Sequence, residues 1–235
     1  MWRHPRTILR NAVAACALPQ HCVLCGTHDP RLAVCGECIG SLPGRNAQRC
    51  PVCADLASGA QICGQCLSHP PRFSHVAAAL SYRFPTDALV QRLKYGSDLT
   101  LIDALAGLLA QRVESEPRPD IVVPMPLAPL RLRERGFNQA LEIARVLCRQ
   151  LQLRLALDYL RRARDTAPQA MLPWKERRRN IRGAFVCEAN LEGAHVAVVD
   201  DVVTTGETLN EVARTLLRAG ASKVVGWVVA RTEKP

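Results

Sequence analysis

Eight cysteines within a 45-residue stretch constrain the fold of this 235-residue chain more than any other feature. They form four CxxC pairs, and the first four cysteines recur 28 residues later. The two sets are Cys22, Cys25, Cys35, Cys38 and Cys50, Cys53, Cys63, Cys66. A gap of two residues lets both sulfurs of a tight turn reach one ion, and two such turns complete a tetrahedral site. The spacing therefore predicts two zinc ribbons.

Two other interpretations of the cysteines explain less. A disulfide framework is typical of secreted chains, and no convincing secretion signal is present. A redox CxxC motif needs one pair at a strand–helix junction, whereas this segment has four pairs. Four thiolates close the coordination shell of zinc, so we expect structural ions that supply most of the folding free energy of the segment. Sequential and crossed pairing of the CxxC units both remain open.

Beyond about residue 75 the hydrophobic pattern changes to that of an α/β domain. Apolar residues at helical spacing predict helices over 87–96, 100–113, 138–151 and 207–220. Continuous apolar runs predict buried strands over 121–127, 195–201 and 223–231. Such strands between helices indicate a parallel sheet that is covered on both faces, with ligands at the carboxyl ends of the strands. We therefore expect a lead helix over 1–18, a double zinc ribbon over 19–72 and an α/β domain over 73–235.

The segment HVAVVDDVVTTGETL, residues 195–209, carries the clearest binding signal. Two acids, Asp200 and Asp201, follow a predicted strand, and the next turn leads into a helix N-terminus, where backbone N–H groups favour an anion. The turn offers hydroxyls and one glycine, at Thr204, Thr205, Gly206 and Thr208. Adjacent carboxylates would repel a phosphate unless the ligand also carries hydroxyl donors. The expected ligand therefore has a phosphate beside a diol, as in ribose 5-phosphate.

Two other phosphate-binding motifs do not fit this turn. A P-loop needs GxxxxGK[ST], and no lysine follows Gly206. A Rossmann turn needs GxGxxG directly after its strand, which is also absent.

At these residues the chain resembles the type I phosphoribosyltransferases. The stretches VPMPL, RERGFNQALEIA and RRARDTAPQ…ERRRNIRGAF, with paired CxxC units ahead of them, are similar to one branch, the ComF/ComFC proteins. This resemblance spans essentially the whole chain. It implies a parallel-sheet core with a hood, and 5-phosphoribosyl 1-diphosphate (PRPP) with Mg²⁺ as the ligand. By position, Asp200 and Asp201 would hold the ribose hydroxyls, and the turn from Thr204 to Thr208 the 5-phosphate.

The resemblance also assigns roles to basic residues. A loop with Arg131, Arg133 and Arg135 falls where the family holds diphosphate, and arginine binds phosphate oxygens bidentately. Arg135 is the best candidate and Lys94 a weaker one for the same pocket. The segment from 161 to 182 would form the hood over the ligand. One departure is Glu207, where the family usually has a small residue.

The ComF resemblance implies natural competence, with single-stranded DNA and proteins of the competence machinery as partners. The net charge of +10 fits a polyanionic partner, since residues 118–182 carry 15 Lys/Arg against 6 Asp/Glu. An aromatic content of 4% argues against a strong base-stacking platform. The alternative is an active phosphoribosyltransferase in nucleotide metabolism, although no residue identifies an acceptor or a catalytic group.

The expected location is the cytoplasm, because the thiols are reduced there and PRPP is a cytosolic metabolite. No run of residues approaches the roughly 20 apolar residues of a membrane-spanning helix, so we expect no membrane insertion. Contact with the inner face of the membrane would depend on partner proteins.

Overall fold

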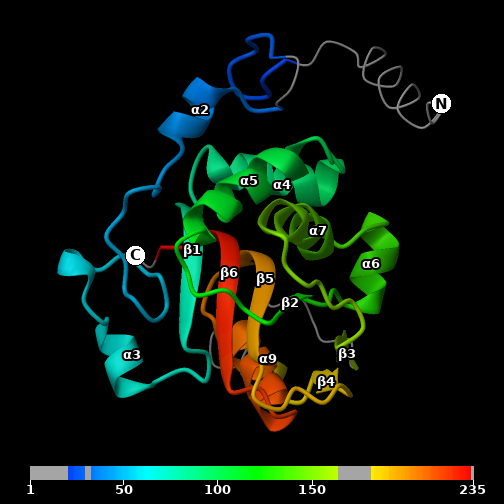
Figure 1. The fold of residues 1–235 in the computed structure, drawn as a ribbon. Helices are drawn as coiled ribbons and strands as arrows, with labels where there is room; N and C mark the ends of the chain where they lie inside the picture. Colours follow the sequence, from blue (N-terminus) through cyan, green and yellow to red (C-terminus); the bar gives the residue numbers. More distant parts are fainter. Residues whose placement is uncertain (1–20, 30–32, 164–180, 234–235) are drawn as a thin grey trace, which may run out of the picture. The chain divides into compact units, whose positions relative to one another are not determined.

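A computed structural model describes residues 21–29, 33–163 and 181–233 of the chain (Figure 1). It forms two compact units, Met1–Ser41 and Leu42–Pro235. The expected lead helix over 1–18 and most of the expected hood, residues 164–180, lie outside the described residues. In the first unit, the helix α2 (Gly36–Ser41) follows a turn closed by a bridge between His21 and His28.

A four-stranded parallel sheet forms the centre of the second unit, with strand order β1-β6-β5-β2 (Figure 1). The strands are β1 (His75–Ser81), β2 (Ile121–Pro124), β5 (His195–Val203) and β6 (Lys223–Arg231). β5 and β6 are central and almost wholly buried, which explains their continuous runs of valine. The predicted parallel sheet is therefore confirmed, and its carboxyl ends meet at one edge.

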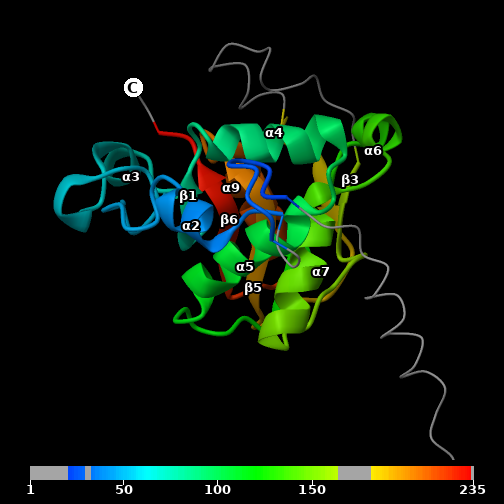
Figure 2. The ribbon, with the colours of Figure 1, turned by 90° about the horizontal axis from the view of Figure 1, so that it is seen from above.

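Helices cover both faces of the sheet. Two helices lie side by side on one face, α5 (Leu101–Val113) and α7 (Gln139–Leu151) (Figure 2). α9 (Glu207–Arg218) packs on the other face. Its Leu209 contacts Gly226 of β6, whereas Trp227, the residue after Gly226 in β6, lies beside α5 and α7. Neighbouring strand residues point to opposite faces, so the two layers lie on opposite sides. α4 (Thr86–Gly96) packs against α5.

The structure departs from the sequence prediction in five elements. β1 pairs with β6 along HVAAALS, an alanine-rich segment for which no strand was predicted. β5 continues through Val203 because β6 supplies pairing partners as far as Arg231. The expected arginine loop is a helix, α6 (Pro129–Arg135), and two short strands, β3 (Leu160–Arg162) and β4 (Phe185–Cys187), form an antiparallel pair.

The second cysteine unit is packed on the α/β body. Its short elements are η1 (Ser58–Ala60) and α3 (Gly64–Ser68). Val52 O accepts from Val76 N at 2.9 Å, and Pro43 O accepts from Ser81 N at 2.8 Å, so the segment covers the outer edge of β1. A covered edge cannot pair with another chain. None of the helices in the described residues is both long and apolar enough to cross a bilayer.

Candidate functional site

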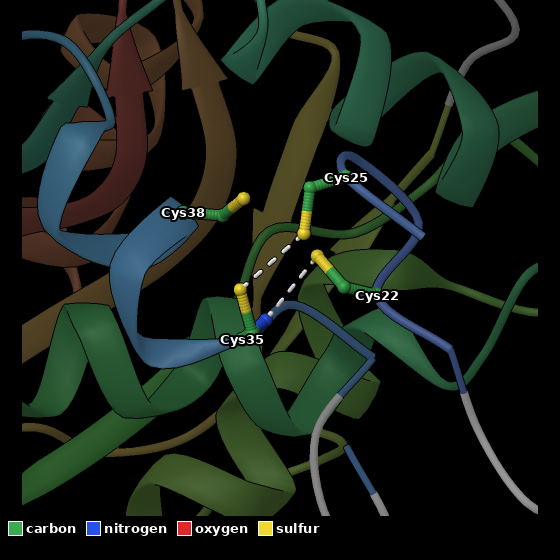
Figure 3. A group of neighbouring side chains, drawn as sticks. All are labelled: Cys22, Cys25, Cys35 and Cys38. Carbon is green, nitrogen blue, oxygen red and sulfur yellow. Dashed lines mark hydrogen bonds between the residues drawn. The ribbon is translucent and has the colours of Figure 1, made fainter. Parts of the chain in front are cut away.

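The eight paired cysteines gather into two clusters, each of four sulfurs lying within 4.8 Å of one another. Figure 3 shows the four sulfurs of the first cluster pointing toward a common centre. Cys25 Sγ lies 3.6 Å from Cys35 Sγ, and Cys53 Sγ lies 3.6 Å from Cys63 Sγ. Two thiolates bound tetrahedrally to zinc at about 2.3 Å would lie about 3.8 Å apart. The clusters fit zinc, and they show sequential pairing of the CxxC units.

Backbone N–H groups prepare these sulfurs for a metal. Cys35 N donates to Cys22 Sγ at 3.4 Å, and Cys63 N donates to Cys50 Sγ at 3.3 Å. Burial raises the pKa of the Cys22 thiol, but backbone N–H donors outweigh burial and lower the pKa to about 6. The same balance lowers the pKa of Cys50 to about 7. The thiolate is the form that binds zinc, so Cys22 and Cys50 are the ligands that ionise first. Contacts with the neighbouring sulfurs raise the pKa of Cys38, and burial raises the pKa of Cys66.

The acid pair lies on β5 near the carboxyl edge of the sheet. Asp201 is 4% exposed, and its Oδ2 lies 2.8 Å from Lys94 Nζ at the end of α4. Asp200 is half-buried, and its Oδ1 accepts from Asp201 N at 2.8 Å. The structure thus brings Lys94 to the acid pair, as its sequence position suggested.

Charges in this cluster perturb one another. Burial, followed by the charge of Asp201, raises the pKa of Asp200 to about 8. Burial acts against the charge of Lys94, but the neighbouring Asp201 and Asp200 outweigh it and raise the pKa of Lys94. The half-buried Lys94 therefore stays charged beside Asp201. A ligand with hydroxyl donors or a bound cation would favour ionisation of Asp200.

The turn after β5 opens a helix, as the sequence predicts. Thr204 to Gly206 form a bend, and α9 begins at Glu207 with Gly206 as its N-cap. Gly206 has φ of 82°, a conformation that a residue with a side chain rarely adopts. Thr205 Oγ1 accepts from Glu207 N at 3.4 Å. The bend thus presents backbone N–H groups and hydroxyls at the positive end of α9.

The arginines of α6 are not equivalent. Arg135 packs over the ring of Tyr95 at 5.2 Å, and its Nη1 donates to Gln139 Oε1 at 3.1 Å. Tyr95 directly follows Lys94, so Arg135 is held beside the end of α4 that reaches Asp201. Arg131 instead forms an ion pair with Glu134 at 3.1 Å, and Arg133 is exposed. Of the three arginines, Arg135 is the one that contacts the C-terminal end of α4, which also carries Lys94.

Comparisons with known proteins agree with this geometry. Residues 96–234 match the model of the phosphoribosyl transferase domain, and residues 13–67 match that of the double zinc ribbon domain. DNA utilization protein YhgH of Escherichia coli strain K12 is 36% identical over 78% of this chain and 84% of its own length. Competence protein F of Haemophilus influenzae is 31% identical over 89% and 96%, and competence protein ComFC of Streptococcus pneumoniae is 25% identical over 84% and 87%.

The chain belongs to the ComF family. Its members in these comparisons carry names that refer to competence or DNA utilization. This chain matches both domain models, with the double zinc ribbon ahead of the phosphoribosyl transferase domain.

Two residues of this ComF protein beside the site were not found from the sequence. Tyr95 is 71% exposed, and Arg231, the last residue of β6, is 1% exposed and lies beside the bend. The sequence did contain a signal for Arg231, because this charged residue directly follows the apolar run that forms β6. Arg231 also lines a cavity of about 410 Å³, which Thr205, Gly206 and Glu207 share with Cys53 of the second cluster. The acid pair does not line this cavity, so the cavity opens on the ribbon side of the bend.

Proposed function

We propose that this ComF protein binds PRPP with Mg²⁺ at the carboxyl edge of its parallel sheet. The observation that carries the proposal is the close succession, on β5, of the acid pair and of a glycine turn that opens α9. Asp200 and Asp201 accept hydrogen bonds from the ribose hydroxyls. The N–H groups and hydroxyls of residues 204–208 hold the 5-phosphate.

The remaining part of PRPP, its diphosphate, is assigned to the arginine side of the site. Arg135 presents a guanidinium whose orientation is fixed by Tyr95 and Gln139, which suits bidentate contact with phosphate oxygens. Mg²⁺ bound to the diphosphate would neutralise charge that the carboxylates alone would repel. Arg131 is a weaker candidate because Glu134 already pairs with it.

Calorimetric titration with PRPP and Mg²⁺ tests the proposal. We expect Asp201→Asn to weaken binding about 10- to 100-fold, because a hydrogen bond to a charged group contributes about 1.5–3 kcal/mol. The control is Asp158→Asn, which removes an exposed carboxylate outside the site and should leave the affinity unchanged. Absence of PRPP binding by the unmodified protein, or equal affinity of Asp201→Asn, would contradict the proposed site.

We further propose that the protein handles single-stranded DNA in the cytoplasm, together with proteins of the competence machinery. Its relatives are named for competence and DNA utilization. The structural support is that Phe84 and Tyr95, 78% and 71% exposed, flank the two ends of α4. An 11-residue helix is about 16 Å long, so two bases of one strand could stack on these rings. Few aromatic residues are present, yet these two are exposed.

Fluorescence anisotropy with a labelled oligothymidylate tests this surface. We expect Phe84→Ala and Tyr95→Ala each to weaken binding by about 1–3 kcal/mol, the contribution of one base–aromatic stack. Affinity should also fall steeply as salt rises, because arginines contact phosphates. The control is Leu99→Ala, which removes an apolar side chain that is 50% exposed. Absence of binding at low salt, or full affinity of both aromatic variants, would refute the proposal.

The same site also supports a second function, transfer of the phosphoribosyl group to an acceptor. The match to the phosphoribosyl transferase domain over residues 96–234 favours it. In this reaction the bond from the anomeric carbon to diphosphate breaks while the acceptor bonds to that carbon. Diphosphate release from PRPP in the presence of bases, amines or oligonucleotides, lost in Asp201→Asn, would establish transfer. If none of these acceptors causes diphosphate release, the pocket binds PRPP without transferring its phosphoribosyl group.

A further inference from the structure

Arg231 connects the second cysteine cluster with the bend after β5. Its Nε donates to Cys53 O at 2.9 Å, and its Nη2 lies 3.6 Å from Asp55 Oδ2. On the other side, its Nη1 donates to the carbonyls of Val203, at 3.2 Å, and of Thr204. The side chain is 2% exposed, so these contacts are shielded from water. One buried guanidinium therefore spans both sites.

The contacts with the bend fix the direction of its N–H groups. In a planar trans peptide the C=O and the following N–H point in opposite directions. Because Arg231 holds the carbonyls of Val203 and Thr204 on its side, the N–H groups of Thr204 and Thr205 face away from it. These N–H groups belong to the turn that is proposed to hold the 5-phosphate. Arg231 thus acts on the donors without needing to touch the ligand.

The contacts with the ribbon lie beside the ligands of the second cluster. Cys53 is one of the four sulfur ligands of the second cluster, and its own carbonyl accepts from Arg231. Ala54 follows it with φ of 57°, and Cys50 N donates to Asp55 O at 2.7 Å, so the turn from Cys50 to Asp55 is tightly wound. Zinc holds the two sulfurs of this turn together. Without zinc, the acceptors of Arg231 on this side would lose their fixed positions.

We infer that Arg231 is a positioning residue through which the second zinc centre holds the phosphate-binding bend in shape. Zinc occupancy of that centre and binding of a sugar phosphate at the bend are then linked. Linkage is reciprocal, so each ligand strengthens the binding of the other by the same factor. The ligand part of this inference rests on the proposed function, whereas the effect of zinc on the bend does not.

Hydrogen exchange measured by mass spectrometry tests the effect on the bend in the absence of sugar phosphate. Removal of zinc by a chelator should speed exchange in a peptide containing residues 203–208 about tenfold or more, within the usual range of coupling between linked sites. In Arg231→Met exchange should already be fast with zinc bound, and the chelator should change it less than about twofold. The inference would be overturned if zinc removal left the exchange rate of the bend unchanged in the unmodified protein. It would also be overturned if zinc removal raised the exchange rate equally in Arg231→Met.

A second variant separates Arg231 from general docking of the ribbon. Arg49 also ties the ribbon to the body, because it donates to Ala54 O at 2.9 Å and to Ser81 Oγ at 2.9 Å. Neither of these contacts of Arg49 involves the bend. In Arg49→Met, hydrogen exchange at residues 203–208 should therefore still become faster when zinc is removed. Arg231→Lys, which retains the charge but lacks the planar fork, should behave as an intermediate. Identical behaviour of Arg49→Met and Arg231→Met would show that docking alone matters, which overturns the role of Arg231.

Titration with ribose 5-phosphate tests the reciprocal part. Removal of zinc should weaken its binding by the same factor by which ribose 5-phosphate raises the zinc affinity, measured with a chromophoric chelator. Zinc-dependent exchange without any binding of ribose 5-phosphate would support the role of Arg231 and contradict the proposed function. Binding that is indifferent to zinc would overturn the linkage.

Discussion

Asp200 and Asp201 are neighbours in sequence, but their surroundings differ. Lys94 pairs directly with Asp201, whereas Asp200 lies beside that buried carboxylate without a cation at contact distance in the described structure. Burial and the charge of Asp201 therefore raise the pKa of Asp200 to about 8. Near neutral pH, much of Asp200 is protonated before any ligand arrives.

This raised pKa predicts a pH-dependent affinity for PRPP with Mg²⁺. The ligand brings hydroxyl donors and a cation, so it prefers the ionised carboxylate, and binding releases a proton. Affinity should therefore rise with pH until the pKa of Asp200 is passed, about tenfold between pH 7 and pH 9. The phosphates of PRPP are already ionised in most of this range. Titration calorimetry at several pH values measures the trend.

Asp200→Asn provides the control for the pH dependence. This variant should bind more weakly than the unmodified protein at pH 9, with an affinity that is nearly flat between pH 7 and pH 9. If the affinity of Asp200→Asn for PRPP still rises steeply with pH, the proton released on binding comes from another group.

At the scale of elements, the close approach of α9 to β6 depends on a glycine. A Cβ at Gly226 would overlap Leu209 Cδ2, and Leu209 is only 2% exposed. We expect Gly226→Ala to lower the free energy of unfolding by about 1–3 kcal/mol, the usual effect of overpacking a core. It should also displace the start of α9 and weaken PRPP binding. Urea denaturation and calorimetry measure the two effects.

Gly107 on α5 offers a matched control, because a Cβ there meets no atom within 4 Å. Gly107→Ala should raise the free energy of unfolding by up to about 1 kcal/mol, since alanine favours a helix more than glycine does. Equal effects of the two substitutions would show that the contact between α9 and β6 is not tight.

These elements also show where sequence reasoning succeeds. Valine-rich β5 and β6, the largely apolar α5 and the amphipathic α7 and α9 have clear sequence patterns, so their positions could be predicted. β1 could not, because its alanines have little preference for strands and its burial comes from pairing with β6. The acid pair and the glycine turn lie close together in sequence, so their place at the end of a strand and the start of a helix could be predicted. Arg231 was missed because its partner Cys53 is 178 positions away in sequence, and no local pattern reveals such a contact.

At the scale of the whole molecule, the two units differ in what stabilises them. The buried apolar residues in the described part of the first unit are small, namely Cys22, Ala33, Val34 and Cys35. Such a segment cannot bury enough apolar surface to fold alone, so zinc must supply most of its folding free energy. The α/β body instead has a continuous core of valine, leucine and isoleucine on both faces of its sheet. Its folding should not require the metal.

Limited proteolysis with and without a chelator tests this division. With zinc bound, residues 33–41 should resist cleavage. After chelation, protease should cut within 33–41 at once, while residues 75–163 and 181–231 resist cleavage for much longer, because cleavage follows the population of the unfolded state. Slow cleavage of residues 75–163 and 181–231, together with faster exchange at the bend, would show that zinc shapes the site without stabilising the core. Cleavage of both regions at one rate would mean that the two units share a single folding transition, and that the metal stabilises the whole chain.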